Sequence, residues 1–149
     1  ISTGTCGVLA DIEENAFLVP VRALRDEGTS YHYAAPSRYM EMQIEVISAI
    51  EQALEQRGIP YEEVMTWTTD GFYRETAEKV AYRKEEGCAV VEMECSALAA
   101  VAQLRRVVWG ELLFTADSLV DLDNYDSRDW GSEAFDKALE LCFAIVHHM

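Results

Sequence analysis

Short apolar runs alternate with amphipathic stretches along most of the chain, which predicts alternating strands and helices. The apolar runs 16–22, 62–68, 88–93 and 107–116 have the length and composition of strands. Pro20 lies inside the first of them and indicates a sheet edge or a bulge there. Apolar residues at helical spacing predict a helix from Ser37 to Gly58, with others at 74–86, 95–106 and 131–148. Residues 1–10 are predicted to form a turn, and 23–36 and 117–129 to form loops.

Continuous apolar strands are typical of a sheet that is covered on both faces. The pattern therefore predicts one α/β domain, a three-layer α/β/α sandwich with a mixed, largely parallel central sheet. Ligands of such sheets collect at the carboxyl ends of the strands. Polar residues follow three of the predicted strands, in the segments 68–76 (TTDGFYRET), 91–95 (VEMEC) and 114–119 (FTADSL). We expect a site where these segments meet.

Composition narrows the classes of function. The 149 residues include 27 acidic and 12 basic side chains, for a formal net charge of −15. Such a charge argues against nucleic acid and anionic membrane as partners, because both need clustered Lys and Arg. No apolar run approaches the roughly 20 residues of a membrane span. The four cysteines form no CxxC pair and no zinc spacing, so we expect free thiols, no metal and a cytoplasmic location.

Several residues in these segments could carry chemistry. The glycine-flanked segment 4–7 (GTCG) could aim backbone N–H groups at an anion, although it is weak evidence by itself. Glu92 and Glu94 either begin a helix or accept hydrogen bonds from a ribose diol. Asp117 is either a loop cap or a general acid that protonates a leaving group. The aromatic pair 72–73 is either core or a surface on which a nucleobase stacks.

Taken in order, five motifs resemble the purine nucleoside/uridine phosphorylase family, and the resemblance covers nearly the whole chain. They are STGTCG (2–7), DEGTSYHY (26–33), TTDGFYRET (68–76), VVEMECSALAAVA (90–102) and FTADSL (114–119). The resemblance implies an α/β/α fold that cleaves the N-glycosidic bond of nucleosides, with phosphate as co-substrate and no cofactor. It also implies a homo-oligomer, either a dimer or a hexamer. Family members have a leading segment that is absent here, so residues 1–149 are expected to be the C-terminal part of a longer domain.

The resemblance also implies roles for individual residues. Phosphate would be bound by Thr5 with the help of Gly4. The ribose would pack on Met93 and be held through its 2′-hydroxyl by Glu94, with Glu92 nearby.

For the base, the resemblance implies stacking on Phe72, with Tyr73 beside it. Asp117 stands where purine-specific members keep the acid that protonates N7. Arg128 is expected to orient Asp117.

The chain departs from the family pattern in two places. The arginine that phosphorylases carry before the GTCG-like segment is Ser2 here, so either Arg22 or Arg25 replaces it or water is the nucleophile. Hydrolases that cleave methylthioadenosine and adenosylhomocysteine also lack that arginine. The glutamine and arginine with which uridine-specific members read a pyrimidine are missing from residues 74–78, which together with Asp117 favours a purine.

The leading hypothesis is therefore a purine nucleoside phosphorylase that releases free base and ribose 1-phosphate. A nucleoside hydrolase with the same site is the first alternative. A non-catalytic nucleoside-binding protein is the second.

Overall fold

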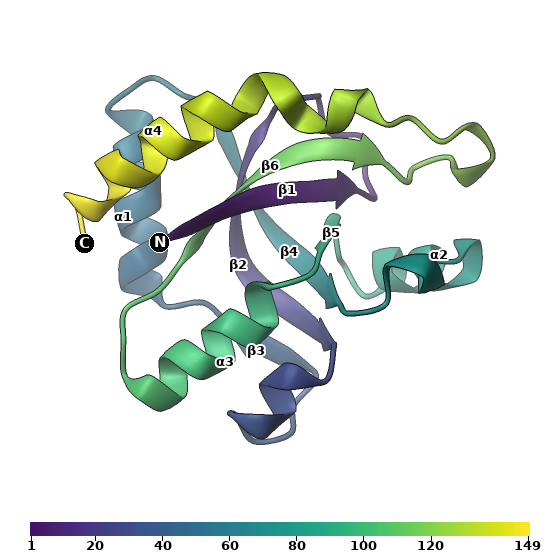
Figure 1. Cartoon of the computed structure of the whole chain (residues 1–149), viewed down its shortest axis with the longest axis horizontal. Helices are drawn as coiled ribbons and strands as arrows, with labels where there is room; N and C mark the ends of the chain where they lie inside the picture. Colours follow the sequence, from purple (N-terminus) through teal and green to yellow (C-terminus); the bar gives the residue numbers. More distant parts are fainter.

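The computed structural model describes residues 1–149 and shows an α/β fold built on a mixed sheet of six strands. The chain also forms four α-helices and four short 3₁₀ segments, of which η3, η4 and α4 follow the last strand (Figure 1). None of the helices is long and apolar enough to cross a bilayer. The strands are β1 (Ser2–Val8), β2 (Phe17–Asp26), β3 (Tyr39–Glu41), β4 (Tyr61–Thr69), β5 (Val90–Glu92) and β6 (Glu111–Ser118). The α-helices are α1 (Ile44–Glu55), α2 (Ala77–Glu85), α3 (Cys95–Arg105) and α4 (Phe135–Val146), and the 3₁₀ segments are η1 (Thr29–His32), η2 (Phe72–Arg74), η3 (Leu122–Asn124) and η4 (Arg128–Ala134).

The predicted α/β fold with a mixed sheet is confirmed, but the sheet closes on itself, which corrects the expectation of a three-layer α/β/α sandwich. Its strand order is β3-β2-β4-β5-β1-β6, and β2 also pairs with β6. β2 can do this because β4 occupies one of its edges along the whole strand, while Phe17 and Leu18 pair with β6 on the other edge. Past a register shift at Pro20, β3 takes over that second edge. The irregularity expected at Pro20 is thus confirmed, and it separates the two partners.

Helices cover the outside of this closed sheet. α1 and α4 pack together on one side, where Ile50, Leu54, Leu141 and Ile145 form the largest apolar cluster with Phe114 of β6 (Figure 1). α3 packs on β2, β3 and β4, away from that cluster. All four cysteines are buried free thiols, as expected.

Three predicted elements differ from the observed ones. The predicted turn at residues 1–10 is the strand β1, which pairs in parallel with β6. The predicted helix start at Ser37 is wrong, because Tyr39–Glu41 pairs with β2 and α1 begins only after Gln43. The Ser37 hydroxyl instead accepts from Arg25 and donates to a backbone carbonyl.

The strands also run further than their apolar composition indicates. β2 continues through residues 23–26, which were expected to be loop, because β4 pairs with it as far as Asp26. β6 begins at Glu111, after the start predicted at residue 107, and extends through Asp117. Asp117 therefore belongs to a buried strand and does not follow one.

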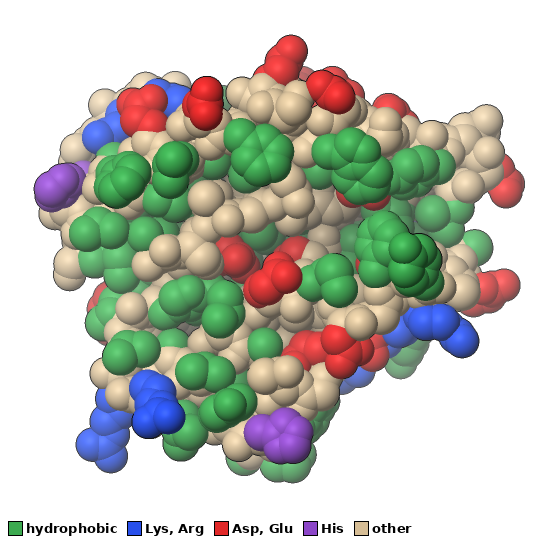
Figure 2. All heavy atoms as spheres, in the orientation of Figure 1, with side chains coloured by type: hydrophobic (Ala, Val, Ile, Leu, Met, Phe, Trp, Pro, Cys, Tyr) green, Lys and Arg blue, Asp and Glu red, His purple; other side chains and the backbone are tan.

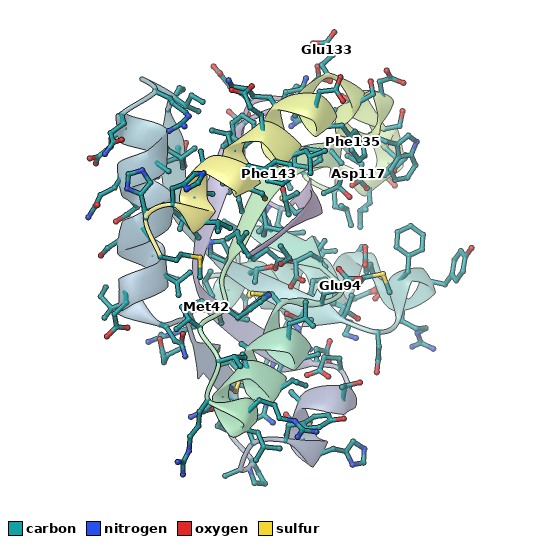
Figure 3. The ribbon with its side chains drawn as sticks, turned by 60° about the vertical axis from the view of Figure 1, so that its left-hand side comes forward. Met42, Glu94, Asp117, Glu133, Phe135 and Phe143 are labelled. Atoms are coloured by element: carbon teal, nitrogen blue, oxygen red, sulfur yellow. The ribbon has the colours of Figure 1, made fainter.

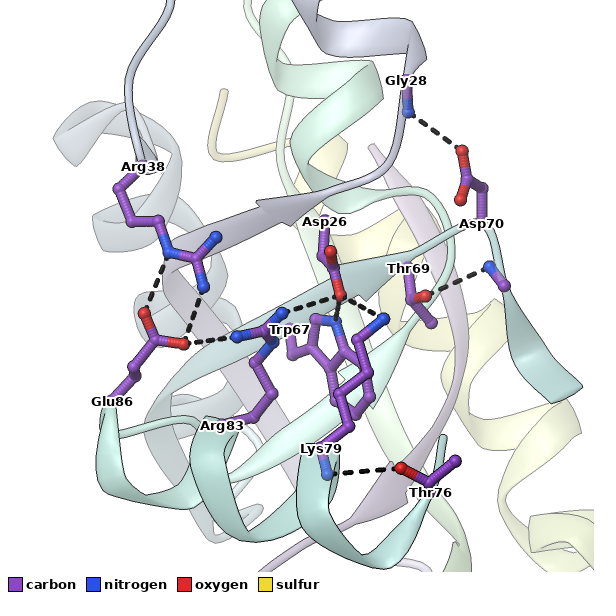
Figure 4. A network of polar contacts seen from close by, with 11 residues as sticks. Asp26, Gly28, Arg38, Trp67, Thr69, Asp70, Thr76, Lys79, Arg83 and Glu86 are labelled. Carbon is purple, nitrogen blue, oxygen red and sulfur yellow. Dashed lines mark hydrogen bonds and ion pairs between the residues drawn. The ribbon is translucent and has the colours of Figure 1, made fainter. Parts of the chain in front are cut away.

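A polar network fixes α2 against the sheet, and with it the η2 segment that leads into the site (Figure 4). Asp26 at the end of β2 accepts hydrogen bonds from the Trp67 indole at 2.9 Å and from Arg83 at 3.0 Å. The Lys79 ammonium lies 2.8 Å from the same carboxylate oxygen. Burial opposes ionisation of Asp26, but the hydrogen bonds from Lys79 and Arg83 outweigh it and lower its pKa.

Removal of this carboxylate should destabilise the protein. We expect Asp26→Ala to lower the free energy of unfolding by about 1–3 kcal/mol, since three donors lose a charged acceptor. Because the folded-state pKa lies below the ordinary value of 3.8, this stabilisation is present above that pH and is lost as the pH falls further. Urea denaturation at pH 7 and pH 3 measures both effects. Glu85→Ala, at an exposed position of α2, is the matched control, and equal destabilisation by the two variants would contradict the account.

Candidate active site

One cavity of about 190 Å³ lies where the carboxyl ends of the parallel strands β1 and β6 meet β5, which runs antiparallel to β1. We call it the strand-end pocket. All three segments that were expected to meet at strand ends contribute to it, and acidic side chains gather at the centre of this face of the molecule (Figure 2). Its lining residues are Thr5, Cys6, Gly7, Phe72, Glu75, Val91, Glu92, Met93, Glu94, Asp117, Leu119 and Trp130.

Asp117 is held firmly at the wall of this pocket. It is only 8% exposed, and its Oδ2 atom accepts a hydrogen bond of 3.0 Å from the Tyr125 hydroxyl. Its Oδ1 atom lies against Gly7, where an added Cβ would come within 3.0 Å of that oxygen and 2.6 Å of Leu119. Gly7 is therefore a close-packing glycine within β1, so residues 4–7 belong to a strand and not to the expected turn.

Glu92 is an anchor within the fold. Its Oε1 accepts from the hydroxyls of Thr66 and Thr68 at 3.1 and 2.6 Å, and its Oε2 accepts from the backbone N–H groups of Glu94 and Cys95 at 2.7 and 2.6 Å. Burial raises the pKa of Glu92, and these four hydrogen bonds oppose that rise. The carboxylate thus joins β4 and β5 to the first turn of α3, with no acceptor position left over for a ligand.

Glu94, by contrast, is exposed and makes no side-chain hydrogen bond within the chain. It precedes α3 and lines the pocket together with Met93, which is partly exposed. Figure 3 shows Glu94 on the side of α3 and Asp117 on the side of β6 and α4. Of the two glutamates considered from the sequence, only Glu94 is free to bind a substrate hydroxyl.

Sequence reasoning did not find Glu75, which follows η2 and lines the pocket. It is half-buried and has no hydrogen-bond partner in the chain. Burial, with the negative charge of Asp117 as a second cause, raises the pKa of Glu75 to about 7. Trp130 and Tyr125 were also missed, because both come from the loop region after β6, whose path the sequence pattern does not define.

Some of the expected site residues lie elsewhere. Phe72 lines the pocket, but Tyr73 is 94% exposed and only contacts the edge of the Phe72 ring. Gly4 does not line the pocket, although Thr5 does. Arg128 does not orient Asp117, because its guanidinium donates to the carbonyl of Ile12 at 2.7 Å.

No Lys, Arg or His lines the strand-end pocket. The two arginines considered as replacements for the one missing at Ser2 are engaged elsewhere. Arg22 pairs with Glu41 at 2.7 Å, and Arg25 is buried against the Ser30 hydroxyl and the Tyr31 ring. Neither arginine lines the pocket, so the structure gives no support to the alternative in which one of them replaces the missing phosphate ligand.

A second hollow, of about 140 Å³, lies between β3 and α3. It is lined mainly by Met40, Met42, Ala99 and Trp109, and its one carboxylate, Glu41, is already paired with an arginine. It lacks free titratable groups, so the strand-end pocket is the better candidate for chemistry.

Comparison with known proteins agrees with this fold. Residues 1–148 match the family model described as Phosphorylase superfamily, and the chain belongs to that family. Among curated proteins it is similar to the uncharacterized protein R802 of Acanthamoeba polyphaga mimivirus, with 28% identity over 116 residues, which are 77% of this chain and 42% of that protein.

Solved structures show the same fold. AMP nucleosidase from Bacteroides thetaiotaomicron matches with a TM-score of 0.77 and 22% identity, over 97% of this chain and 57% of its own. Purine nucleoside phosphorylase from Toxoplasma gondii, in complex with immucillin-H, matches with a TM-score of 0.81 and 20% identity. The match covers 96% of this chain and 60% of that one. Futalosine hydrolase of Helicobacter pylori matches with a TM-score of 0.80 and 18% identity. The match covers 98% of this chain and 66% of that one. The chain thus spans about three-fifths of the length of these solved structures.

Proposed function

We propose that the protein cleaves the N-glycosidic bond of purine-type nucleosides in the strand-end pocket. The observation that carries this proposal is the content of one cavity. It combines a buried carboxyl held by a tyrosine, an unpartnered carboxylate and a partly exposed aromatic ring, in Asp117, Glu94 and Phe72. Membership of the phosphorylase superfamily supports a reaction of this class.

In the proposed reaction the base stacks on Phe72 and the sugar lies against Met93. The bond between C1′ and N9 breaks with its electron pair moving to the base, and Asp117 gives a proton to N7. Glu94 accepts a hydrogen bond from the 2′-hydroxyl and stabilises the positive charge that develops on the sugar. The nucleophile oxygen then bonds to C1′; when the nucleophile is water, it releases a proton to solvent, and Asp117 takes up a proton from solvent before the next turnover. General acid catalysis of this kind contributes about 100- to 10,000-fold to the rate.

The proposed function has two versions, which differ in whether phosphate or water is the nucleophile. The sequence motifs favour phosphate, which would give ribose 1-phosphate. The pocket favours water, because the side chains that line it include no cation to pair with a phosphate dianion. Among the matching structures are both a phosphorylase and hydrolases or nucleosidases, at identities that establish only the fold.

Release of free base from adenosine, inosine, methylthioadenosine and uridine, with and without phosphate, tests this proposal. We expect purine release at equal rates in both buffers, with ribose as the sugar product. Release only in the presence of phosphate, with ribose 1-phosphate formed, would establish a phosphorylase and contradict water as the nucleophile. Nucleoside binding without release of any base would support the non-catalytic alternative and overturn the proposal.

We also propose a homo-oligomeric assembly. α4 exposes an apolar stripe of Phe135, Leu139, Phe143 and Val146, each more than half exposed (Figure 3). Contiguous apolar surface of this kind is typical of protein interfaces. The stripe begins a few residues after Trp130, so an interface there would lie next to the strand-end pocket.

A further inference from the structure

Tyr125 reaches the strand-end pocket from the loop that follows β6. This loop turns back at η3, whose backbone N–H groups donate to the Asp121 carboxylate at 3.0 and 3.3 Å. It then returns to the end of β6, where the backbone N–H of Ser118 donates to the carbonyl of Asp126 at 2.8 Å. Because Ser118 follows Asp117 and Asp126 follows Tyr125, this backbone contact brings the tyrosine beside the acid.

The two oxygens of the Asp117 carboxyl have different surroundings. Oδ2 accepts the hydrogen bond of 3.0 Å from the Tyr125 hydroxyl, whereas Oδ1 accepts no hydrogen bond from the chain. Oδ1 lies against Gly7, and both residues line the strand-end pocket. A protonated carboxyl carries its single proton on one oxygen and accepts through the other. With Oδ2 in use as the acceptor, the proton belongs on Oδ1.

We propose that Tyr125 is a positioning residue for the acid, which holds the proton of Asp117 on Oδ1 and stabilises the carboxylate that remains when this proton moves to the base. This inference rests on the proposed function, and it adds the group that prepares the acid for the reaction.

The hydrogen bond from Tyr125 gains strength during the proton transfer. The O–H bond at Oδ1 breaks and leaves its electron pair on the carboxylate, while the lone pair of the base nitrogen N7 forms the new N–H bond. The negative charge that develops spreads over both carboxylate oxygens. A hydrogen bond to an ionised acceptor is stronger than one to a neutral acceptor, so the donor at Oδ2 favours the transition state over the ground state.

The other titratable groups of the pocket make this donor important. They are Cys6, Glu75, Glu92 and Glu94. Their carboxylates oppose a further negative charge at Asp117, because like charges in one site disfavour ionisation. Burial, the hydrogen bond to Asp117 and the charges of neighbouring carboxylates raise the pKa of Tyr125 to about 12. Its hydroxyl therefore keeps its proton at neutral pH and stays a donor.

The test is base release by Tyr125→Phe from the purine nucleoside that the wild-type protein cleaves fastest. The variant keeps the aromatic ring, whose centroid lies 6.4 Å from that of Trp130, and removes only the hydroxyl. We expect kcat to fall about 10- to 100-fold, because a hydrogen bond to a charged acceptor is lost, with KM unchanged. Tyr82→Phe, at an exposed tyrosine of α2, is the matched control and should keep the wild-type kcat.

Two further measurements separate positioning of the acid from simple support of the loop. In Asp117→Asn no proton is transferred from this residue, so the added change Tyr125→Phe should cause no further loss of kcat. With Asp117 present, loss of the donor favours the protonated acid, so the alkaline limb of the pH profile of kcat should move up by about one pH unit. A tyrosine that only supports the loop would lower kcat in both backgrounds and leave this limb in place.

The outcomes distinguish this inference from the proposed function. If the wild-type protein releases base and Tyr125→Phe has the kcat of Tyr82→Phe, the positioning role is overturned and the proposed function stands. An equal loss with and without Asp117, or an unmoved alkaline limb, overturns the role as well. If the wild-type protein releases no base, the proposed function fails and the role of Tyr125 fails with it.

Discussion

Replacement of Asp117 by asparagine should lower base release by about 100- to 10,000-fold, because an amide cannot deliver the proton that the leaving base requires. The change keeps the shape of the side chain. Asparagine fits the space beside Gly7, and its carbonyl oxygen can still accept from the Tyr125 hydroxyl. The loss should therefore fall on kcat, with binding of the nucleoside largely retained. Steady-state kinetics and equilibrium binding measure the two quantities separately.

Asp123→Asn is the matched control for this result. Asp123 is an exposed acid in η3 of the same loop and does not line the pocket. We expect it to leave kcat and KM unchanged. If Asp117→Asn cleaves at the rate of the control, Asp117 is not the acid, whatever its burial.

Replacement of Glu92 by alanine should produce the largest loss of stability among the pocket residues, about 3–5 kcal/mol. The four donors that share its carboxylate would be left without an acceptor in a buried place. They come from Thr66 and Thr68 of β4 and from the first turn of α3, so the start of α3 should loosen as well. Urea denaturation measures the change, and amide hydrogen exchange at Cys95 reports on the helix start.

Glu94→Ala is the comparison that separates structure from function. Glu94 is exposed and unpartnered, so its removal should change the free energy of unfolding by less than about 0.5 kcal/mol. It should nevertheless lower kcat/KM, because the 2′-hydroxyl loses its acceptor. Equal unfolding midpoints for Glu92→Ala and Glu94→Ala would contradict the anchor role of Glu92.

Much of the element order could be predicted from the sequence, because apolar periodicity reports directly on burial. The strands near 62–68 and 88–93 and the helix at 95–106 agree with β4, β5 and α3. Closure of the sheet could not be predicted, because it depends on which partners take the second edge of β2. Pairing also turned residues 39–41 into a strand, against a helical pattern that continues through them.

The candidate site, too, could be predicted only in part from the sequence. Phe72, Met93, Glu94 and Asp117 were expected to come together, and they line one cavity because each stands at or just after the end of a strand. Arg128 was misplaced, since a long side chain after a loop can reach many partners.

Glu75 and Tyr125 were missed because their approach to Asp117 depends on how η2 and the loop after β6 fold back over the sheet. The pattern of apolar and polar residues does not predict the path of these two segments.

The central claim is that the strand-end pocket binds a purine nucleoside in a cleavable orientation. A crystal structure with a C-nucleoside, whose base and sugar are joined by a carbon–carbon bond that cannot be cleaved this way, tests it most directly. We predict the base against Phe72, its N7 edge within hydrogen-bond distance of Asp117, and the sugar hydroxyls at Glu94. An analogue found in the hollow between β3 and α3, or in the strand-end pocket with its sugar turned away from Glu94, would contradict the claim.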